Sequence, residues 1–392
     1  MVRAIAVYIG IFLFWGLPLA FGRVTPEPAD RHFEAYLYML RGKSVALVVN
    51  QTSMVHDSLL PELLVARGVA VKKIFVPEHG FRGREDAGAH IGNSIDSLTG
   101  LPILSSYGRH KKPDSADLAD VDILVYDLQD VGVRFYTYIS TLQYCMEACA
   151  TYKKKIIVLD RPDPNGFYVD GPVLEEKFRS FVGMQCIPVV YGMTCGEYAE
   201  MLVGEHWLSC PSTPDLQVIP CTHYSHKSRY LLPVAPSPNL RTAAAIYAYP
   251  SLCLFEGTSV SVGRGTDLPF TQYGSPDFAG VFTYTFTPVS LPGASQPPYK
   301  DKVCYGERVD GQSLSAGETS GITLRWLIKA YHASTGKDLF FTPFFKSLSG
   351  TDSLEAQIKA GYTEEKIKRQ WQKGLMNFKA IRKKYLLYAD FE

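Results

Sequence analysis

Residues 121–160 have the sequence VDILVYDLQDVGVRFYTYISTLQYCMEACATYKKKIIVLD, and this stretch decides the fold class. Its two short apolar runs, 121–127 and 156–160, have the length and composition of buried strands. The segment 140–152 between them has a helical pattern. A strand, a helix and a second strand at this spacing predict a right-handed crossover between parallel strands.

The same alternation continues on both sides of this unit. Apolar runs at 45–50, 71–76, 187–191 and 216–219 predict further strands, and 58–67 and 195–203 predict helices. We therefore expect an α/β protein with a Rossmann-like parallel-sheet domain at 23–225. Residues 226–392 are expected to form a smaller α+β auxiliary domain, with a cleft between the two. This second domain should contain ordered site loops, a helix at 321–335 and a helical stretch at 353–388 broken near Gly361 and Gly374.

Composition excludes several classes of function. Lys plus Arg number 40 against 39 Asp plus Glu, so the chain has no positive surplus with which to hold a nucleic acid. It also lacks the glycine-rich phosphate-binding fingerprints, so no nucleotide cofactor is expected. The eight cysteines have no metal-binding spacing, and Cys145 and Cys149 are interpreted as buried free thiols. We expect neither a metal nor another cofactor.

Residues 1–22 have the features of a targeting segment. Arg3 precedes an uncharged run that ends in the small-residue pattern Ala20-Phe21-Gly22, which predicts a cleaved signal peptide. An uncleaved membrane anchor is the alternative, but Pro18 and the glycines weaken a continuous helix there. The mature protein is therefore expected to be exported, to a periplasm.

Polar side chains follow four of the predicted strands. Asn50 follows the first, Glu78 and His79 the second, Asp127 the third, and Asp160 the fourth. In open α/β sheets ligands bind beyond the carboxyl ends of the strands, where such residues converge. Each one alone could be a helix cap or part of a structural ion pair. Together they predict a binding site at this edge of the sheet.

Glu78 is the strongest candidate for acid–base chemistry. It lies in PEHGFRG at 77–83, directly after an apolar strand, and the glycines of this motif let a substrate approach the backbone. A carboxyl group partly shielded from water in such a loop suits general acid–base catalysis. The structural alternative is a Glu paired to Arg82 or Arg84. Glu85 and Asp86 follow on the same loop, and one of them could be a second carboxylate.

The densest polar and aromatic cluster is DLQDVGVRFYTYIST at 127–141. Hydrogen-bonding groups mixed with tyrosines suit a sugar ring, which offers hydroxyls at its edge and CH groups on its faces. In contrast, Thr194 and Glu197 have the spacing of a capping box and are interpreted as structural.

Seven motifs, in order, resemble those of a known family. They are PEHGFRG (77–83), DLQDVGVRFYTYIST (127–141), DRPDPNG (160–166), GMTCGE (192–197), PSPNL (236–240), CLFEGTSVSVGRGTDLPF (253–270) and YLLY (385–388). Together they resemble the NamZ-type exo-β-N-acetylmuramidases, glycoside hydrolase family 171, over nearly all of the mature chain. The resemblance implies a Rossmann-like catalytic domain, an auxiliary domain, and a cleft that releases N-acetylmuramic acid (MurNAc) from the non-reducing end of peptidoglycan fragments. It also implies that Glu78 is catalytic.

This substrate carries a lactyl carboxylate, so the site should hold an arginine able to bind it bidentately. Arg264 or Arg134 could do so, and the structural alternative is an ion pair to Glu256 or Asp130. The catalytic candidates are Glu78 and, after it, Glu85, Asp127 and Asp130. The candidates for substrate binding are Asn50, His79, Arg82, Gln129, Arg134, Tyr136, Tyr138, Asn239, Glu256 and Arg264.

Two other classes of protein are alternatives to a glycoside hydrolase. A periplasmic muropeptide- or sugar-binding protein would use the same cleft without catalysis. A muropeptide amidase or esterase would need a metal or a serine nucleophile, and the sequence has neither the zinc-ligand spacing nor the G-x-S-x-G elbow. The expected partners are therefore peptidoglycan-derived muropeptides or MurNAc-GlcNAc fragments.

Overall fold

The computed structural model describes residues 25–83, 85, 86, 88, 92–309 and 321–392, and the expected signal peptide lies outside these residues. The first part of the chain is built on a seven-stranded sheet in the order β5-β6-β4-β1-β7-β8-β9. Its strands are β1 (Ser44–Val49), β4 (Ala70–Val76), β5 (Ser94–Ile95), β6 (Pro102–Ser105), β7 (Ile123–Asp127), β8 (Lys155–Leu159) and β9 (Asp215–Ile219). All neighbours are parallel except β5 and β6. The six parallel strands follow the Rossmann order 3-2-1-4-5-6, so the predicted fold class is confirmed.

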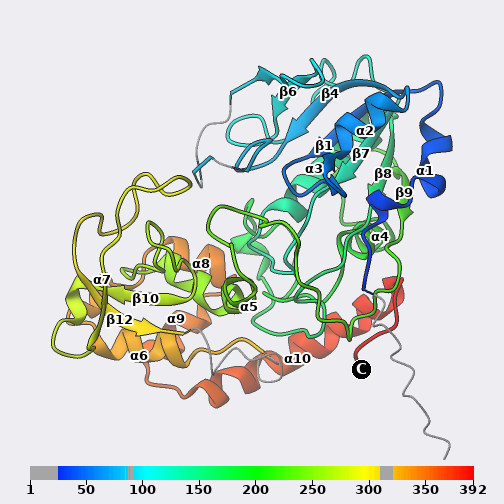
Figure 1. The fold of residues 1–392 in the computed structure, drawn as a ribbon. Coiled ribbons are helices and arrows are strands. Elements are labelled where there is room, and N and C mark those ends of the chain that lie inside the picture. The colour runs from blue at the N-terminus through cyan, green and yellow to red at the C-terminus, as the bar shows by residue number, and fades with distance from the viewer. Residues whose placement is uncertain (1–24, 84, 87, 89–91, 310–320) are drawn as a thin grey trace, which may run out of the picture.

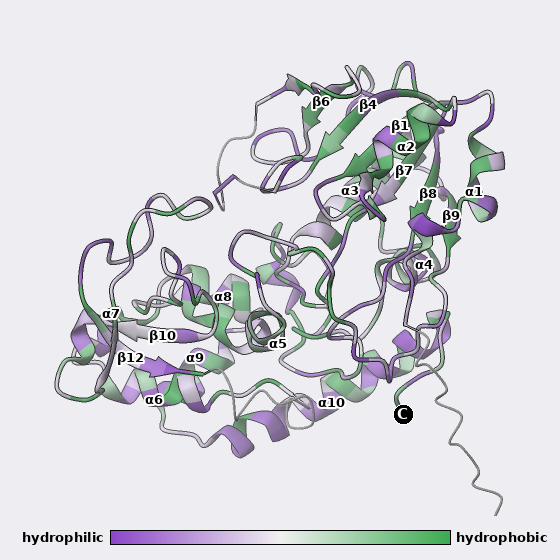
Figure 2. Ribbon diagram, viewed as in Figure 1, coloured by the Kyte–Doolittle hydropathy of each residue, from purple (hydrophilic) through white to green (hydrophobic). Residues whose placement is uncertain are grey.

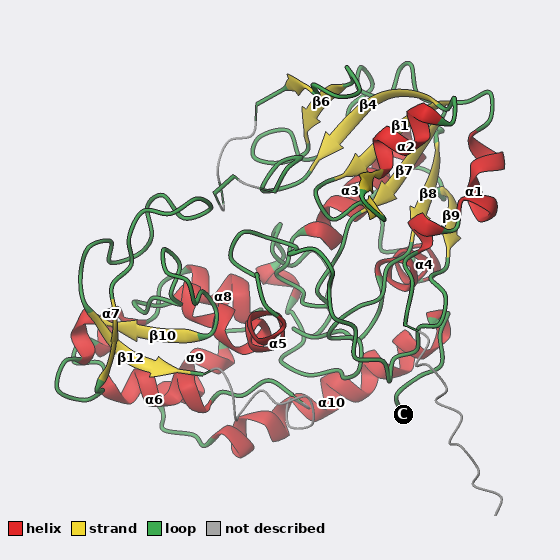
Figure 3. Ribbon diagram, in the orientation of Figure 1, coloured by secondary structure: helices red, strands yellow, loops and turns green. Residues whose placement is uncertain are grey.

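Helices cover both faces of this sheet, as Figures 1 and 3 show. On one face α1 (Phe33–Leu40) and α2 (Leu60–Ala66) pack through Tyr36 and Leu64, and on the other face α3 (Tyr138–Thr151) and α4 (Cys195–Gly204) pack through Leu142 and Leu202. Alternate residues of each central strand therefore enter different cores, and the strands are largely apolar (Figure 2). Burial on both faces explains why these strands are continuous apolar runs in the sequence.

Two details of the sheet differ from the prediction. Residues 187–191 do not form a strand of the sheet, although Val189 and Val190 are fully buried. Val190 makes only isolated bridges, to Val133 and Asp170, so the run is apolar because it crosses the core as a loop. The short strands β5 and β6 were not predicted, because β6 begins at Pro102 and has only two apolar residues after it.

The second part of the chain packs against the first through one continuous apolar core. Its antiparallel sheet has the order β10-β12-β11, formed by Gln272–Ser275, Cys304–Arg308 and Tyr284–Phe286. Around it lie α5 (Ala243–Leu252), α6 (Arg325–Ala333), α7 (Lys337–Phe340), α8 (Phe344–Ser349), α9 (Ser353–Lys359) and α10 (Glu364–Arg382). The short elements are η1 (Ala29–Arg31), β2 (Met54–Val55), β3 (Ser58–Leu59), η2 (Glu176–Phe178), η3 (Cys253–Gly257), η4 (Pro276–Phe278) and η5 (Lys383–Tyr385). The smaller α+β part is therefore confirmed.

Helix α10 returns the chain to the first part (Figure 1). The predicted break near Gly361 separates α9 from α10, but the predicted break at Gly374 is wrong because α10 continues through it. Gly374 instead lets the helix approach Val173, whose Cγ2 would lie 3.2 Å from an added Cβ. After α10, Tyr388 donates a hydrogen bond to Asp160 at 2.5 Å. The C-terminal segment is thus tied to the end of β8.

The start of α4 and two buried cysteines agree with the sequence predictions. Thr194 and Glu197 form the predicted capping box at the start of α4. Cys145 and Cys149 are free and buried, as expected. No helix within the described residues has both the length and the apolar character needed to cross a membrane.

Candidate active site

A cavity of about 420 Å³ lies where the first part meets the second. The first part contributes residues that follow β4 and β6 and those at the start of α3, and the second part contributes residues from α5, η3, the loop 264–270 and α8. The polar lining side chains are Glu78, His79, Tyr107, Thr137, Ser237, Glu256 and Arg264, and the aromatic ones are Phe135, Tyr136, Phe181, Tyr249, Phe270 and Phe344. Carboxylates, a guanidinium group and several rings therefore line one cavity.

Glu78 is held in place by three hydrogen bonds. The backbone N–H of Gly88 donates to Oε1 at 2.8 Å, and the Tyr107 hydroxyl donates to the same oxygen at 2.9 Å. The Thr137 hydroxyl donates to Oε2 at 3.2 Å. The partly buried carboxyl group thus has a fixed orientation at the wall of the cavity. Burial and the neighbouring Glu78 carboxylate raise the pKa of Tyr107, so its hydroxyl remains a donor at neutral pH.

His79 fixes the backbone next to Glu78. Its φ angle is 72°, in the left-handed region that non-glycine residues rarely adopt, so the motif stores local strain beside the carboxyl group. The ring Nδ1 lies 2.8 Å from the carbonyl oxygen of Glu85. Because a carbonyl only accepts, Nδ1 carries the proton, and burial lowers the pKa of His79. The neutral ring therefore leaves Nε2 as an acceptor.

Glu256 and Arg264 form the charged pair on the opposite wall. The Arg264 Nε donates to Glu256 Oε1 at 2.5 Å, and the guanidinium carbon lies 4.9 Å from the centre of the Phe270 ring. Burial lowers the pKa of Arg264, but the Glu256 carboxylate raises it by more, so the group stays cationic. Glu256 accepts from the Nε of Arg264, so the two terminal amino groups of this guanidinium can bind a ligand.

A group of polar side chains stabilises the backbone around Glu78 and Pro236: Asn50, Tyr136 and Tyr138. Asn50 Nδ2 donates to the Tyr138 hydroxyl at 2.8 Å, and that hydroxyl lies 3.5 Å from the carbonyl oxygen of Glu78. The Tyr136 hydroxyl donates to the carbonyl oxygen of Pro236 at 2.8 Å, across to the second part. Tyr136 lines the cavity, whereas Asn50 and Tyr138 do not.

Four predicted site residues lie in the core instead of the cavity. Asp127 is fully buried and accepts two hydrogen bonds from Arg161, at 2.6 and 3.0 Å, while Arg161 also bonds Asp30 of η1. Asp130 accepts from Tyr191 and from the Gly132 N–H, and burial raises its pKa to about 6. Both carboxyl groups therefore make their hydrogen bonds inside the core, and neither lines the cavity, although Asp130 Oδ1 is buried without a hydrogen-bond partner among the described residues.

Gln129 and Arg134 are likewise structural. The Gln129 amide donates to the carbonyl oxygens of Asp130 and Pro162, both at 2.9 Å. Arg134 is fully buried, and its guanidinium donates to four backbone carbonyls. Burial lowers the pKa of Arg134 to about 9. Neither side chain lines the cavity, so neither reaches a ligand there.

Arg82, Glu85 and Asn239 lie beside the cavity. Arg82 pairs with Asp96 at 3.0 Å rather than with Glu78, and it lines a separate pocket of about 530 Å³ together with Glu85 and His79. Arg84, the other partner considered for Glu78, lies outside the described residues. Asn239 donates to the carbonyl oxygen of Gly293 at 2.9 Å and is buried.

The sequence predicted Tyr136 but none of the other Phe and Tyr rings that line the cavity. Tyr107 follows β6, and the apolar pair Ile103-Leu104 was the only signal of that strand. Phe181 and Phe344 lie in irregular or short elements, where no periodicity marks them. The 44% exposure of Phe344 leaves a large part of this ring free to meet a ligand.

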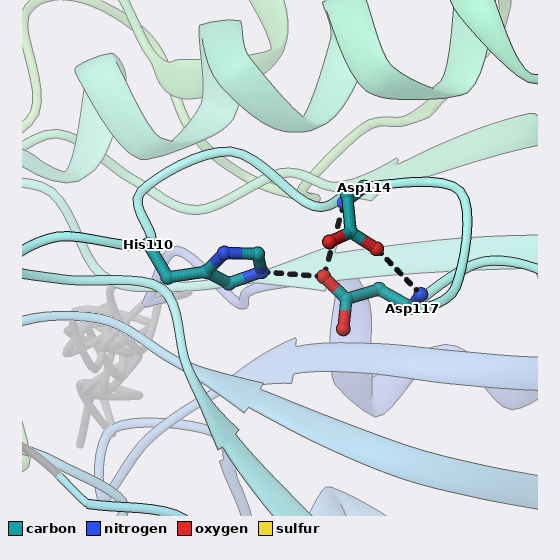
Figure 4. Close-up of side chains that lie close together, drawn as sticks. All are labelled: His110, Asp114 and Asp117. Atoms are coloured by element: carbon teal, nitrogen blue, oxygen red, sulfur yellow. Dashed lines mark hydrogen bonds and ion pairs between the residues drawn. The ribbon is translucent and has the colours of Figure 1, made fainter.

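One group of potential metal ligands occurs elsewhere among the described residues. His110, Asp114 and Asp117 lie close together on the loop after β6 (Figure 4). Asp117 already contacts His110 Nε2 at 2.6 Å and accepts from the Asp114 N–H at 3.0 Å, while Asp114 accepts from the Ala116 and Asp117 N–H groups. The carboxylates therefore stabilise the turn, and the loop is exposed.

The fold and the cavity together define the class. A Rossmann-order sheet and an α+β part border a cavity lined by two carboxyl groups, an arginine and several rings, so the chain is an α/β protein whose cavity suits a polar sugar ligand.

The comparisons with known proteins identify the family. The chain matches the models described as exo-beta-N-acetylmuramidase NamZ, N-terminal, over residues 45–244, and NamZ, C-terminal, over residues 247–388. It belongs to this family, as its motifs predicted.

Individual relatives agree with this assignment. The chain is 37% identical over 376 residues to the peptidoglycan beta-N-acetylmuramidase NamZ of Bacillus subtilis (strain 168), covering 90% of this chain and 89% of that protein. A DUF1343 family crystal structure from Bacteroides fragilis NCTC 9343 is 47% identical, with a TM-score of 0.87 over 94% of this chain and all of that one. A second one from the same organism is 29% identical, with a TM-score of 0.77 over 93% of this chain and all of that one.

Proposed function

We propose that this protein releases MurNAc from the non-reducing end of peptidoglycan fragments, with the cavity between its two parts as the active site. The observation that carries the proposal is the Glu78 carboxyl group, held by Gly88, Tyr107 and Thr137 at the wall of that cavity. Family membership supplies the reaction, and the geometry supplies a carboxyl group with a defined orientation for it.

In this proposal Glu78 exchanges a proton with the bridging oxygen of the glycosidic bond. Cleavage passes through an oxocarbenium-like transition state and needs a carboxyl group at the leaving oxygen. The partly buried position of Glu78 at the cavity wall strengthens its charge interactions relative to those of a fully exposed carboxylate. The Tyr107 and Thr137 hydroxyls keep the carboxyl group from rotating away during turnover.

Arg264 is proposed to bind the lactyl carboxylate that distinguishes MurNAc from GlcNAc. Glu256 holds Nε of this arginine, so the terminal amino groups can make the parallel pair of hydrogen bonds that a carboxylate accepts. The rings of Tyr249, Phe181 and Phe344 on the same cavity offer surfaces for the CH faces of a sugar.

The direct test is incubation of the purified protein with MurNAc-GlcNAc, followed by chromatographic detection of free MurNAc. Release of MurNAc by the wild-type chain and its loss in Glu78→Gln support the proposal. Binding of the disaccharide without release would instead identify a muropeptide- or sugar-binding protein. Muropeptides with a peptide attached, tested in parallel, define which fragments are accepted.

Export is a separate proposal that rests on Arg3, the uncharged run after it and the Ala20-Phe21-Gly22 site. The mature chain should begin near Arg23 and fractionate with the periplasmic proteins. N-terminal sequencing of the protein from its native host that still finds Met1 would refute it.

A further inference from the structure

Arg134 connects the two parts of the chain next to residues that line the cavity. Its Nη1 donates to the carbonyl oxygens of Pro172 and Ile187 in the first part, at 2.9 and 2.7 Å. Its Nη2 donates to the carbonyl oxygens of Leu348 and Ser349 in the second part, at 2.8 and 3.0 Å. A single planar guanidinium group, fully buried, thus fixes the distance between the two parts.

The second pair of carbonyls belongs to the last turn of α8, and this helix forms a wall of the cavity. Phe344 and Leu348, one turn apart on α8, both line the cavity. The carbonyls at a helix C-terminus lack partners within the helix and attract a cation, which the Arg134 guanidinium provides. Arg134 therefore stabilises α8 in the position from which Phe344 reaches the cavity.

The backbone after Arg134 forms the opposite wall. Phe135, Tyr136 and Thr137 all line the cavity, and the Thr137 hydroxyl donates to Glu78. The same short segment thus contacts the Glu78 carboxyl group through the Thr137 hydroxyl and the end of α8 through the Arg134 side chain. No other described side chain bonds the end of α8 from this segment.

Gly350 shows how closely the guanidinium group packs against the end of α8. Its φ angle is +76°, and a Cβ added there would lie 2.7 Å from Arg134 Nη2 and 3.0 Å from Leu174 Cα. A side chain at position 350 would push the guanidinium group or α8 from its place.

We infer that Arg134 is a positioning residue for substrate binding: it sets the width of the cavity by holding the α8 wall against the wall that carries Glu78. The inference rests on the proposed use of this cavity. Arg134 does not touch the substrate, and its effect passes through Phe344 and Leu348.

The test is the affinity for MurNAc-GlcNAc, measured by calorimetry in the Glu78→Gln background so that no turnover occurs. Arg134→Lys keeps the charge, but its single ammonium group cannot span both pairs of carbonyls. We expect the Kd in that background, and the KM in the otherwise wild-type enzyme, to rise on the order of 10-fold, because small displacements of positioning groups are costly. The kcat should fall by less than the KM rises, since Glu78 keeps its own three partners.

Arg382→Lys is the matched control. Arg382 is, like Arg134, almost completely buried, and it bonds the Gly192 carbonyl and Asp390 away from the cavity. This variant should lower the unfolding temperature as Arg134→Lys does but leave the Kd unchanged. If both variants raise the Kd equally, the effect is general loosening and the inference is wrong.

Two further variants keep the test decisive if Arg134→Lys folds poorly. Gly350→Ala should raise the Kd from the other side of the same contact. In a Phe344→Ala background the effect of Arg134→Lys on the Kd should shrink, because the residue through which it acts is gone. An unchanged Kd in folded Arg134→Lys and Gly350→Ala overturns the inference, whereas a wild-type chain that binds the disaccharide without cleaving it overturns only the proposed reaction.

Discussion

Glu78→Gln is the most informative single change, because the structure predicts that it removes chemistry and little else. The amide oxygen can take over the role of Oε1 and accept from the Gly88 N–H and the Tyr107 hydroxyl, while the amide nitrogen can donate to Thr137 Oγ1 in place of the bond that Oε2 accepts. All three contacts survive in changed form. The free energy of unfolding should therefore change by less than about 1 kcal/mol.

The catalytic loss should be much larger. General acid–base help is worth about 10²- to 10⁴-fold, which corresponds to roughly 2.7 to 5.4 kcal/mol of transition-state stabilisation. We expect kcat on MurNAc-GlcNAc to fall by at least the lower figure, with the Kd for the disaccharide nearly unchanged. Aryl glycosides with acidic leaving groups need less protonation, so their deficit should be smaller.

The assay is release of MurNAc followed by chromatography, with thermal unfolding measured on the same preparations. A Glu78→Gln protein with nearly wild-type kcat would refute the assignment of Glu78. An equal deficit on disaccharide and aryl glycoside would refute its role as proton donor to the leaving group, while leaving it as a residue of the site.

Further changes test other parts of the site and fold. Arg264→Ala should cost about 1.5 to 3 kcal/mol in kcat/KM on MurNAc substrates and less on GlcNAc analogues, because only MurNAc has the lactyl carboxylate; equal losses would contradict the role of Arg264. Tyr107→Phe removes one of the three bonds to Glu78 and should lower kcat by about fivefold, with unchanged unfolding temperature, and a stopped assay on the disaccharide measures this. Burial raises the pKa of Asp130 from 3.8 to about 6, so between these pH values the folded state binds more protons than the unfolded state, and stability falls as pH rises through this window. Asp130→Asn should flatten that part of the dependence in urea unfolding at pH 4 and pH 7, and an unchanged slope would show that Asp130 does not cause it.

The parallel sheet could be predicted because its physical cause is local in sequence. Strands buried on both faces must be apolar at consecutive positions, and β1, β7, β8 and the second half of β4 show such runs. Burial also explains why a strand was wrongly predicted at 187–191, because a loop that crosses the core needs apolar residues as much as a strand does. Hydrogen bonding distinguishes the two, and it depends on neighbours far away in the chain.

The candidate site could be predicted only in part. Glu78, His79, Tyr136, Glu256 and Arg264 all line the cavity. Asp127 and Arg134 have the same polar character in the sequence. Their hydrogen-bond partners, Arg161 and the end of α8, lie far away in the chain, and these bonds occupy both side chains within the core. The sequence shows which residues carry hydrogen-bonding groups, whereas the tertiary fold decides whether those groups face a ligand or each other.

The contact of η1 with the sheet has a consequence for how the chain can be shortened. Asp30 and Asp127 both contact the buried Arg161 guanidinium group, and the Ala29 N–H donates to the Asp160 carbonyl at 2.9 Å. A protease that trims the chain to residue 33 would remove one of the two carboxyl groups that bond an almost fully buried guanidinium group. Residues 29–31 are therefore an integral part of the Rossmann-like core, and a shortened chain that lacks them should be less stable than the full chain.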